Sequence, residues 1–319
     1  MSESYSTLDE AVLAEAEATL VTIRDFIRFG VSCLRLHDVH LGHGSNDPFA
    51  EASALVLQTL GLEWSADTEI LDAKLLPSER RAVIGLIRRR VNDRTPLGYL
   101  LNIAYFAGLP FYVDERVLVP RSPIAELIAE RFLPWLTEEP QRVLDLCTGS
   151  GCIAIALAKE FPEAMVDATD ISMDALSVAS VNVEHHDLQD NVNLIESDVF
   201  AKLPGQRYDL IVSNPPYVDA EDMADLPPEF LKEPELGLAS GRDGLDLTRR
   251  ILAEAADHLT EDGVLVVEVG NSQWALQQEF PDVAFAWVEF ENGGEGVFVL
   301  TAAQCREHQE TFKAALAAA

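Results

Sequence analysis

Residues 143–156 read VLDLCTGSGCIAIA, and this stretch decides the fold. It predicts a buried strand, a turn of small residues and a helix, in that order. The first strand is RVLDLC, and the pattern continues along the chain, because MVDATD, VNLIES, YDLIVS and GVLVVEVG predict further strands, most of them separated by helical segments. Strands that are apolar on both faces are typical of a parallel sheet covered by helices on each side. The predicted fold class is therefore α/β, with a Rossmann-like sheet.

The N-terminal part of the chain has a different character. Apolar residues recur at helical spacing over 8–30, 47–62 and 76–93, with Asp47 and Ser78 as expected N-caps and Gly30 as an expected stop. Aromatic and β-branched residues alternate over 95–123 and predict a hairpin. We expect a helical substrate-recognition domain at 1–95, a hairpin linker at 96–123 and a catalytic domain at 124–319. The catalytic domain should end in an antiparallel hairpin that turns at 293–294.

Charge is distributed unevenly along the chain of 319 residues, which has a net charge of −31. Residues 1–100 contribute −5 and residues 101–319 contribute −26. A field this negative repels phosphate backbones and attracts basic partners, so direct binding of DNA is not expected. No apolar run approaches the roughly 20 residues that span a bilayer, and residues 1–10 lack the basic and apolar segments of a signal peptide. We expect a cytoplasmic protein with no membrane contact.

The glycine turn, residues 147–151, is ambiguous by itself. Gly149, Gly151 and Ala154 satisfy the pattern G-x-G-x-x-A, and Asp170 ends the next strand about 20 residues later, where an acid would bind ribose hydroxyls. Asp198 follows a third strand and is suited either to an adenine amine or to a helix N-cap. A nicotinamide dehydrogenase fits these residues as well as a methyltransferase does.

The stretch SNPPYV, residues 213–218, separates these two readings. Proline fixes φ, so Pro215 and Pro216 make a stiff turn at the end of a buried strand. The side-chain oxygen of Asn214 and the carbonyl of Pro215 can then accept both N–H groups of a planar nitrogen. Tyr217 can pack on the planar group or lie near a sulfonium cation. Positioning and electrostatics would suffice for methyl transfer, whereas hydride transfer has no use for this turn.

The motifs DLCTGSG, SDVF and NPPY, in this order, resemble the class I S-adenosylmethionine-dependent methyltransferases. More narrowly, residues 90–300 resemble the glutamine methyltransferases of ribosomal proteins and release factors, also through RTPLGYL, VVEVGNSQ and GGEGVF. The resemblance implies catalysis by Asn214, Pro215, Pro216 and Tyr217, with S-adenosylmethionine as the cofactor. It implies cofactor contacts from Asp145, Leu146, Cys147, Thr148, Gly149, Ser150, Gly151, Asp170, Ile171, Asp198, Val199 and Asn214. Cys147 departs from the pattern, because many relatives carry a glycine there.

The choice within this family rests on the linker and on charge. VPRSP at 119–123 departs from the P-R-P-[DE]-T-E motif of the release-factor branch and resembles the branch that modifies the third large-subunit ribosomal protein. A basic ribosomal protein, free or in an assembly intermediate, suits the acidic catalytic half, and the acidic residues of 219–237 could form a docking rim. The release-factor enzyme, an RNA or DNA amine methyltransferase and a non-catalytic assembly factor remain alternatives.

Two weaker patterns stand in the helical domain. His37, His40 and His43 recur at every third residue, but their segment has no cysteine partner, so loop structure or a partner contact is favoured over a metal. The arginines at 88–90 and Arg94 could touch RNA, yet a solvated helix end is the simpler reading. We expect no metal site.

Overall fold

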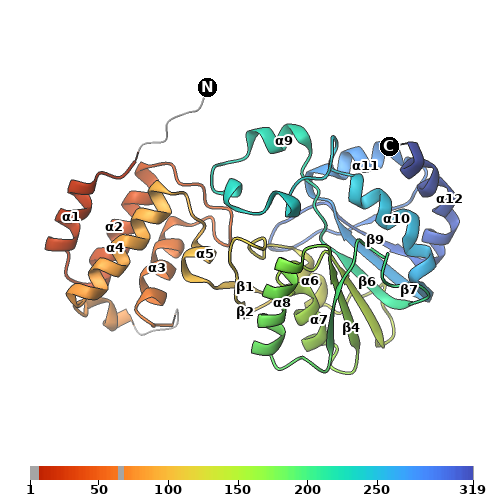
Figure 1. The fold of residues 1–319 in the computed structure, drawn as a ribbon, viewed down its shortest axis with the longest axis horizontal. Helices are drawn as coiled ribbons and strands as arrows, with labels where there is room; N and C mark the ends of the chain where they lie inside the picture. The colour runs from red at the N-terminus through yellow and green to blue at the C-terminus, as the bar shows by residue number, and fades with distance from the viewer. Residues whose placement is uncertain (1–6, 64–67, 319) are drawn as a thin grey trace. The chain divides into compact units, whose positions relative to one another are not determined.

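The computed structural model describes residues 7–63 and 68–318. The chain forms two compact units, drawn in Figure 1: one contains residues up to 103 together with 227–232, and the other contains residues 104–226 and 233–319. Within the described ranges, no helix combines the length and apolar character that a membrane span requires. The signal-peptide expectation rests partly on residues 1–6, which lie outside the described residues.

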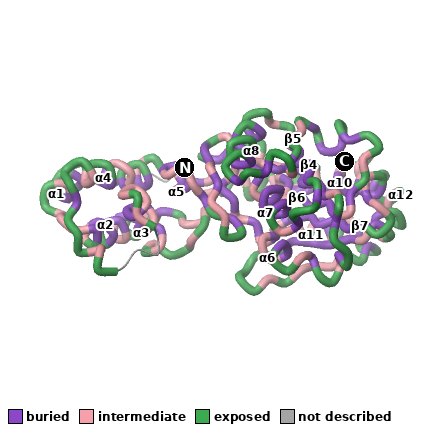
Figure 2. The backbone as a smooth tube through the Cα atoms, turned by 90° about the horizontal axis from the view of Figure 1, so that it is seen from below, coloured by how far each residue is buried: buried purple, intermediate pink, exposed green. Residues whose placement is uncertain are grey.

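The helical unit packs its α-helices around one apolar core. These helices are α1 (Glu10–Thr19), α2 (Ile23–Leu36), α3 (Pro48–Thr59), α4 (Pro77–Asn92) and α5 (Leu97–Leu101). Phe26, Val56 and Val83 are fully buried at the centre, and the buried segments of α2, α3 and α4 stand out in Figure 2. Asp47 caps α3 as predicted, since its carboxylate accepts from the N–H groups of Phe49 and Ala50.

Two predictions for this unit are wrong. The helix expected at 8–30 is divided near Leu20, and α2 begins with a capping box in which Thr22 and Asp25 exchange side-chain and main-chain hydrogen bonds. Gly30 does not stop a helix but lies inside α2, where a Cβ atom would come within 3.1 Å of Ala52 Cβ. The missing side chain thus allows α2 and α3 to approach closely.

The expected cap of the third helix is also wrong. Helix α4 begins at Pro77, and no hydroxyl caps it. Instead, Glu79 Oε2 accepts from the main-chain N–H of Leu76 at 2.7 Å. Proline at the first helical position and an acid two residues later are together sufficient to start the helix.

The second unit contains a small hairpin, β1 (Ala104–Phe106) with β2 (Leu109–Phe111), and a seven-stranded sheet in the order β5-β4-β3-β6-β7-β9-β8. The sheet strands are β3 (Arg142–Leu146), β4 (Met165–Asp170), β5 (Val192–Glu196), β6 (Tyr208–Ser213), β7 (Leu259–Glu268), β8 (Ala286–Trp287) and β9 (Val297–Thr301). Five strands run parallel, while β9 runs antiparallel to β7 and β8. The α/β class is confirmed, and so is the antiparallel hairpin, β8 with β9, but the hairpin does not end the domain because a helix follows β9.

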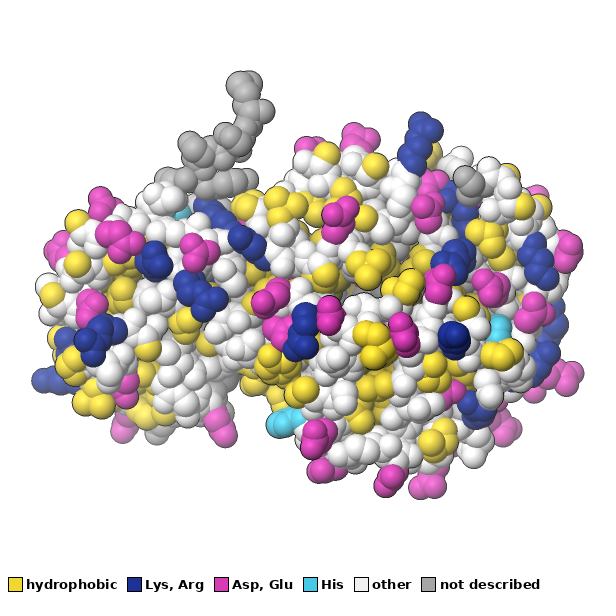
Figure 3. All heavy atoms as spheres, in the orientation of Figure 1, with side chains coloured by type: hydrophobic (Ala, Val, Ile, Leu, Met, Phe, Trp, Pro, Cys, Tyr) yellow, Lys and Arg dark blue, Asp and Glu magenta, His cyan; other side chains and the backbone are white. Residues whose placement is uncertain are grey.

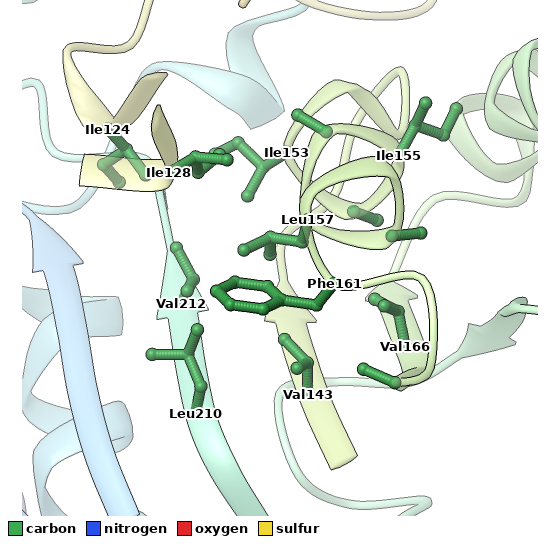
Figure 4. Close-up of a cluster of buried hydrophobic side chains, with 14 of the residues drawn as sticks. Ile124, Ile128, Val143, Ile153, Ile155, Leu157, Phe161, Val166, Leu210 and Val212 are labelled. Carbon is green, nitrogen blue, oxygen red and sulfur yellow. The ribbon is translucent and has the colours of Figure 1, made fainter. Parts of the chain in front are cut away.

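Helices cover both faces of this sheet. They are α6 (Ile124–Ala129), α7 (Cys152–Glu160), α8 (Met173–His185), α10 (Asp246–His258), α11 (Gln273–Glu279) and α12 (Ala302–Ala318). The short helix α9 (Ala220–Asp225) follows the proline turn and has no buried residue. Figure 4 shows one face, where Phe161 of the α7 end lies among Val143, Leu210 and Val212. On the opposite face, α10 and α12 pack on alternate strand residues, with Phe312 fully buried. The alanine-rich end of the chain, for which the sequence predicted no element, is therefore helix α12.

Candidate active site

The topology gathers the predicted site residues at one edge of the sheet. Leu146 at the end of β3 pairs with Thr169 of β4 on one side and with Ser213 of β6 on the other. The Ser213 hydroxyl also donates to the Leu146 carbonyl at 3.0 Å. The glycine turn and Asn214 follow directly on β3 and β6, and Asp170 is the last residue of β4. In open α/β sheets, ligands bind at such carboxyl ends.

A buried carboxylate supports the glycine turn from beneath. Asp145 is fully buried, and its Oδ2 accepts from the Thr148 hydroxyl at 2.5 Å and from the Ala154 N–H at 3.1 Å. Among the described residues its second oxygen, Oδ1, has no hydrogen-bond partner. Desolvation, with a smaller effect of the Asp170 charge, raises the pKa of Asp145 to about 7. An unsatisfied buried acceptor under the turn fits a ligand that brings a cationic amino group.

The surface of the glycine turn is open at Gly149. A Cβ atom at this position would meet nothing within 4 Å, and φ is +55°. The Gly149 N–H donates to Asp170 Oδ2 and the Ser172 N–H donates to Asp170 Oδ1, both at 2.9 Å. Each Asp170 oxygen thus has a main-chain partner and can still accept another donor, as a ribose diol requires.

The other residues of the turn are mostly enclosed. Cys147 adopts the left-handed conformation with φ of +59°, and burial raises the pKa of its thiol. Buried positions within and just before the turn are Leu146, Thr148, Ser150 and Gly151. The Ser150 carbonyl accepts from the Asn182 side chain of α8, which fixes the turn to a second helix.

Asp198 has a partner that the sequence did not indicate. Its Oδ1 lies 2.8 Å from Arg250 Nη1 of α10, and both side chains are partly exposed. Val199 is buried and adopts a positive φ of +51°. Ile171, after β4, is 53% exposed, which suits an apolar face for a planar ring. Asp198 caps no assigned helix.

The proline turn, residues 214–217, begins one residue after β6. Asn214 and Tyr217 are partly exposed, and Pro215 is buried. Val218, the next residue, forms a parallel bridge to Ala239, because its N–H donates to Leu238 and its carbonyl accepts from Ser240. The turn is therefore fixed at both ends, by the sheet before it and by this bridge after it.

Tyr217 is held by residues from remote parts of the chain. Its hydroxyl lies 3.0 Å from Glu268 Oε1 at the end of β7, and its carbonyl accepts from the Ser272 hydroxyl at 3.0 Å. A Cβ atom at Gly270 would lie 2.6 Å from the Tyr217 ring, so the ring packs directly on backbone. Burial and the neighbouring Glu268 carboxylate raise the pKa of Tyr217.

The acidic stretch 219–237 divides into two kinds of residue. Four acids are exposed: Glu221, Asp222, Asp225 and Glu235. Glu229 and Glu233 are buried, so they cannot belong to a docking rim. Glu233 binds Arg121 through both oxygens, at 2.6 and 2.7 Å. Figure 3 shows Asp and Glu side chains dispersed over the visible surface among Lys and Arg.

Glu229 belongs to the helical unit, where it pairs with an arginine of the cluster that was predicted to be a solvated helix end. Glu229 Oε1 lies 3.1 Å from Arg94 Nη1, while Arg90 Nε lies 2.5 Å from Glu51 Oε1. Arg90 and Arg94 are buried, so the expectation of a solvated helix end is wrong for both. Buried charges of this kind are stable only when paired.

The histidine loop is likewise part of the packing of this unit. His40 and His43 contact the Phe230 ring, with centroids 5.3 and 4.4 Å away, and the His40 N–H donates to Glu229. His37 Nδ1 lies 2.9 Å from the Cys33 carbonyl. In the part of the chain that the structure describes, no three His, Cys, Asp or Glu residues are grouped as a metal site would require.

Sequence reasoning missed several residues that shape the active site. They lie far along the chain from the glycine turn and the proline turn or were given no role: Ser122, Arg250, Glu268, Gly270 and Ser272. Four of them lie in the stretches VPRSP and VVEVGNSQ, which carried the family resemblance without residue roles. A buried acid at the end of an apolar strand was the available signal for Glu268.

The chain is similar to several known proteins. The methyltransferase small domain model matches residues 127–242. A ribosomal protein uL3 glutamine methyltransferase of Francisella tularensis subsp. tularensis is 47% identical over 92% of this chain and 94% of that protein. One of Neisseria meningitidis serogroup B is 47% identical over 91% and 96%. The solved hMettl16 catalytic domain with a MAT2A 3′UTR hairpin gives a TM-score of 0.49 at 18% identity, over 70% of this chain and 80% of that one. On the strength of the two relatives, the chain belongs to the family of ribosomal protein uL3 glutamine methyltransferases.

Proposed function

We propose that this protein transfers a methyl group from S-adenosylmethionine to the side-chain amide nitrogen of a glutamine in ribosomal protein uL3. One observation carries the proposal: the proline turn begins at Asn214, directly beside the glycine turn, because β6 and β3 are neighbours that end at Ser213 and Leu146. A site for a planar nitrogen and a site for a methyl donor then share one edge of the sheet.

The glycine turn and its acids form the cofactor site in this proposal. Asp170 binds the ribose hydroxyls, and Gly149 leaves room for the ligand to lie against backbone. The unsatisfied Asp145 oxygen lies beneath the methionine end. Ile171, Asp198 and Val199 surround the adenine. When bound, S-adenosylmethionine supplies an electrophilic methyl group on a sulfonium.

The proline turn orients the acceptor. The Asn214 side-chain oxygen and the Pro215 carbonyl accept the two N–H groups of the glutamine amide, so its nitrogen faces the methyl donor. Rigidity matters here, because near-attack geometry supplies much of the rate in reactions without a strong base. Pro216 fixes the turn, and Tyr217 forms its wall. As the new N–C bond forms, the bond between the methyl group and the sulfonium would break to leave a neutral thioether, and the nitrogen, which becomes acidic, would lose its proton to solvent.

The partner in this proposal is a basic protein in the cytoplasm. The catalytic half of the chain carries a net charge of −26, which attracts a basic ribosomal protein and repels bare nucleic acid. The exposed acids of the loop after the proline turn are candidates for the first contact. We assign substrate recognition to the helical unit, and the acceptor can be either free uL3 or uL3 in an assembly intermediate.

Transfer of labelled methyl groups tests this function. Purified uL3, release factor and ribosomal RNA are each offered with labelled S-adenosylmethionine, and peptide mass spectrometry locates the product. We expect label on one glutamine of uL3. Label on release factor alone, or on RNA alone, contradicts the proposal.

Asn214→Ala tests the amide contact itself. We expect transfer to fall by about 10³-fold, since the variant lacks an acceptor that is needed in the transition state. Calorimetry should show cofactor affinity within about threefold of wild type, since Asp170 and the glycine turn are unchanged. Gln141→Ala, at an exposed position before β3, is the control and should retain wild-type activity. Wild-type turnover by Asn214→Ala would refute the amide clamp.

A further inference from the structure

We propose that Glu268 and Ser122 are positioning residues that hold Tyr217 in place, and that the proline turn is fully ordered for transfer only when the Glu268 carboxylate is ionised. This inference rests on the proposed function for its assay and concerns residues to which the motifs assigned no role. All three residues lie in the second unit, so the argument is internal to that unit.

The contacts form one chain of hydrogen bonds through a buried carboxylate. Glu268 Oε1 lies 3.0 Å from the Tyr217 hydroxyl, and Glu268 Oε2 lies 2.5 Å from the Ser122 hydroxyl. Glu268 is 3% exposed and Ser122 is 8% exposed. Water therefore has little access to either bond, and the position of the Tyr217 hydroxyl depends on this carboxylate.

The direction of these bonds follows from the groups involved. The Ile124 N–H donates to Ser122 Oγ at 3.2 Å, which leaves the Ser122 proton to donate to Glu268. An ionised carboxylate accepts from both hydroxyls, because it offers acceptors only. A protonated Glu268 must itself donate a proton, so one of the two hydroxyls loses its acceptor. Protonation thus weakens the hold on Tyr217 or on Ser122.

The charges around Glu268 place its titration in a useful range. Burial raises the pKa of Glu268 to about 7, and the hydrogen bonds from Ser122 and Tyr217 oppose this rise. The Arg121 charge also lowers the pKa, but both oxygens of Glu233 bind Arg121 and offset its positive charge. The Glu268 carboxyl group therefore titrates near neutral pH. Burial disfavours its ionised form, whereas the hydrogen bonds from Ser122 and Tyr217 favour that form.

The segment that carries Glu268 also contacts Tyr217 at two other points. The Tyr217 ring packs against the backbone at Gly270, two residues after Glu268, and the Ser272 hydroxyl holds the Tyr217 carbonyl. Glu268, Gly270 and Ser272 belong to one short segment at the end of β7. Motion of this segment is thus transmitted to the proline turn through three separate contacts.

The experiment is the pH dependence of kcat for methyl transfer to uL3 between pH 5.5 and 9, with both substrates saturating. We expect kcat of the wild type to fall as the pH is lowered through about 7, and we call this fall the acid limb. Glu268→Gln should lose this limb and lower kcat about tenfold at pH 8, with KM for uL3 changed less than about twofold. Ser122→Ala should move the limb upward by about one pH unit, since it removes a hydrogen bond that favours the ionised form.

Asp167→Asn is the matched control. Asp167 also accepts from a buried tyrosine, Tyr208, at 2.8 Å, but on β4 and away from the proline turn. We expect this variant to keep the wild-type limb even if it is less stable. Ser122→Thr, which retains the hydroxyl, should retain the limb as well, which separates positioning from simple packing.

Each outcome has one meaning. A wild-type profile in Glu268→Gln, or an unmoved limb in Ser122→Ala, overturns this inference while leaving the proposed function intact. A limb that moves equally in Asp167→Asn also overturns it. Absence of transfer to uL3 by the wild type instead refutes the proposed function. Should Glu268→Gln not fold, the Ser122→Ala profile decides alone.

Discussion

The two turns of the active site are built in different ways. Each rests on one buried carboxyl group, and burial raises the pKa of both groups to about 7. Asp145 binds partners 3 and 9 residues away, within its own turn and the helix that follows. Glu268 binds partners 51 and 146 residues away. The carboxyl group beneath the glycine turn therefore has local partners, whereas the one beneath the proline turn has partners that only the assembled fold brings together.

This difference has a mechanical consequence. The glycine turn depends on Asp145 within its own segment, on the end of β4 and on Asn182 of α8, none of which belongs to the proline turn. The proline turn depends on the linker, on the end of β7 and on the loop at 238–240 together. Substitutions far from Asn214 should thus affect transfer without touching the cofactor site, and the next experiments examine that separation.

The largest effect is expected for Gly270→Ala. The added Cβ would lie 2.6 Å from the Tyr217 ring, and φ at this residue is +44°. We expect transfer to uL3 to fall by 100-fold or more and the free energy of unfolding to fall by about 2–4 kcal/mol, as for overpacking combined with backbone strain. Cofactor affinity by calorimetry should change little.

Gly293→Ala is the control for this substitution. It also has a positive φ, of +86°, but its Cβ would meet nothing within 4 Å. Strain alone should lower its free energy of unfolding by about 1 kcal/mol and leave transfer unchanged. Equal transfer rates in the two variants would show that the Tyr217 ring does not depend on Gly270.

A smaller effect is expected on the pH dependence of stability in Asp145→Asn. The pKa of Asp145 is about 7 in the folded protein and 3.8 ordinarily, so the unfolded chain releases the proton first as pH rises. The stability that this residue contributes is present below pH 3.8 and is lost as pH rises to about 7, at up to about 1.4 kcal/mol per pH unit. Asparagine cannot ionise, so the variant should lose less stability over this range.

Urea unfolding at pH 5, 6, 7 and 8 measures this difference. Glu268→Gln should flatten the profile in the same sense, because burial raises the pKa of Glu268 from 4.5 to about 7. The effects of the two substitutions on the free energy of unfolding should add, since their carboxyl groups share no hydrogen-bond partner. A wild-type slope in Asp145→Asn would mean that the Asp145 carboxyl is ionised in the folded protein at pH 5.

The contrast between the turns also explains what the sequence could predict. Strands and helices of the second unit followed from hydrophobic periodicity, and the residues of both turns were contiguous and thus readable. Ser122 and Glu268 were not, because nothing in a sequence states which distant hydroxyl meets which buried acid. The prediction of a docking rim was wrong at Glu229 for the same reason. This residue stands in an acidic loop, yet it is buried beside Arg94.

Local errors had local causes. Gly30 fits a helix stop by composition, but its missing side chain serves the contact with Ala52. Helix α12 escaped prediction because its alanines give no apolar period, although Cys305 and Phe312 anchor it in the core. Tertiary packing overrides residue preference at Gly30, whereas α12 agrees with the high helix propensity of alanine.

The smallest effect is expected for Cys147→Gly in the glycine turn. Cys147 adopts φ of +59°, which costs a residue with a side chain about 1–2 kcal/mol relative to glycine, while glycine loses more entropy on folding. We expect the free energy of unfolding to rise by about 0.5 kcal/mol, with transfer to uL3 within twofold of wild type. Cys147→Ala retains the strain and should not gain stability. Because the hydrogen bonds of the glycine turn run to its own segment, to the end of β4 and to Asn182, and not to residues 214–217, the proline turn should not respond. A change of the kcat acid limb in Cys147→Gly would show instead that the two turns are coupled through Ser213 and the β3–β6 pairing.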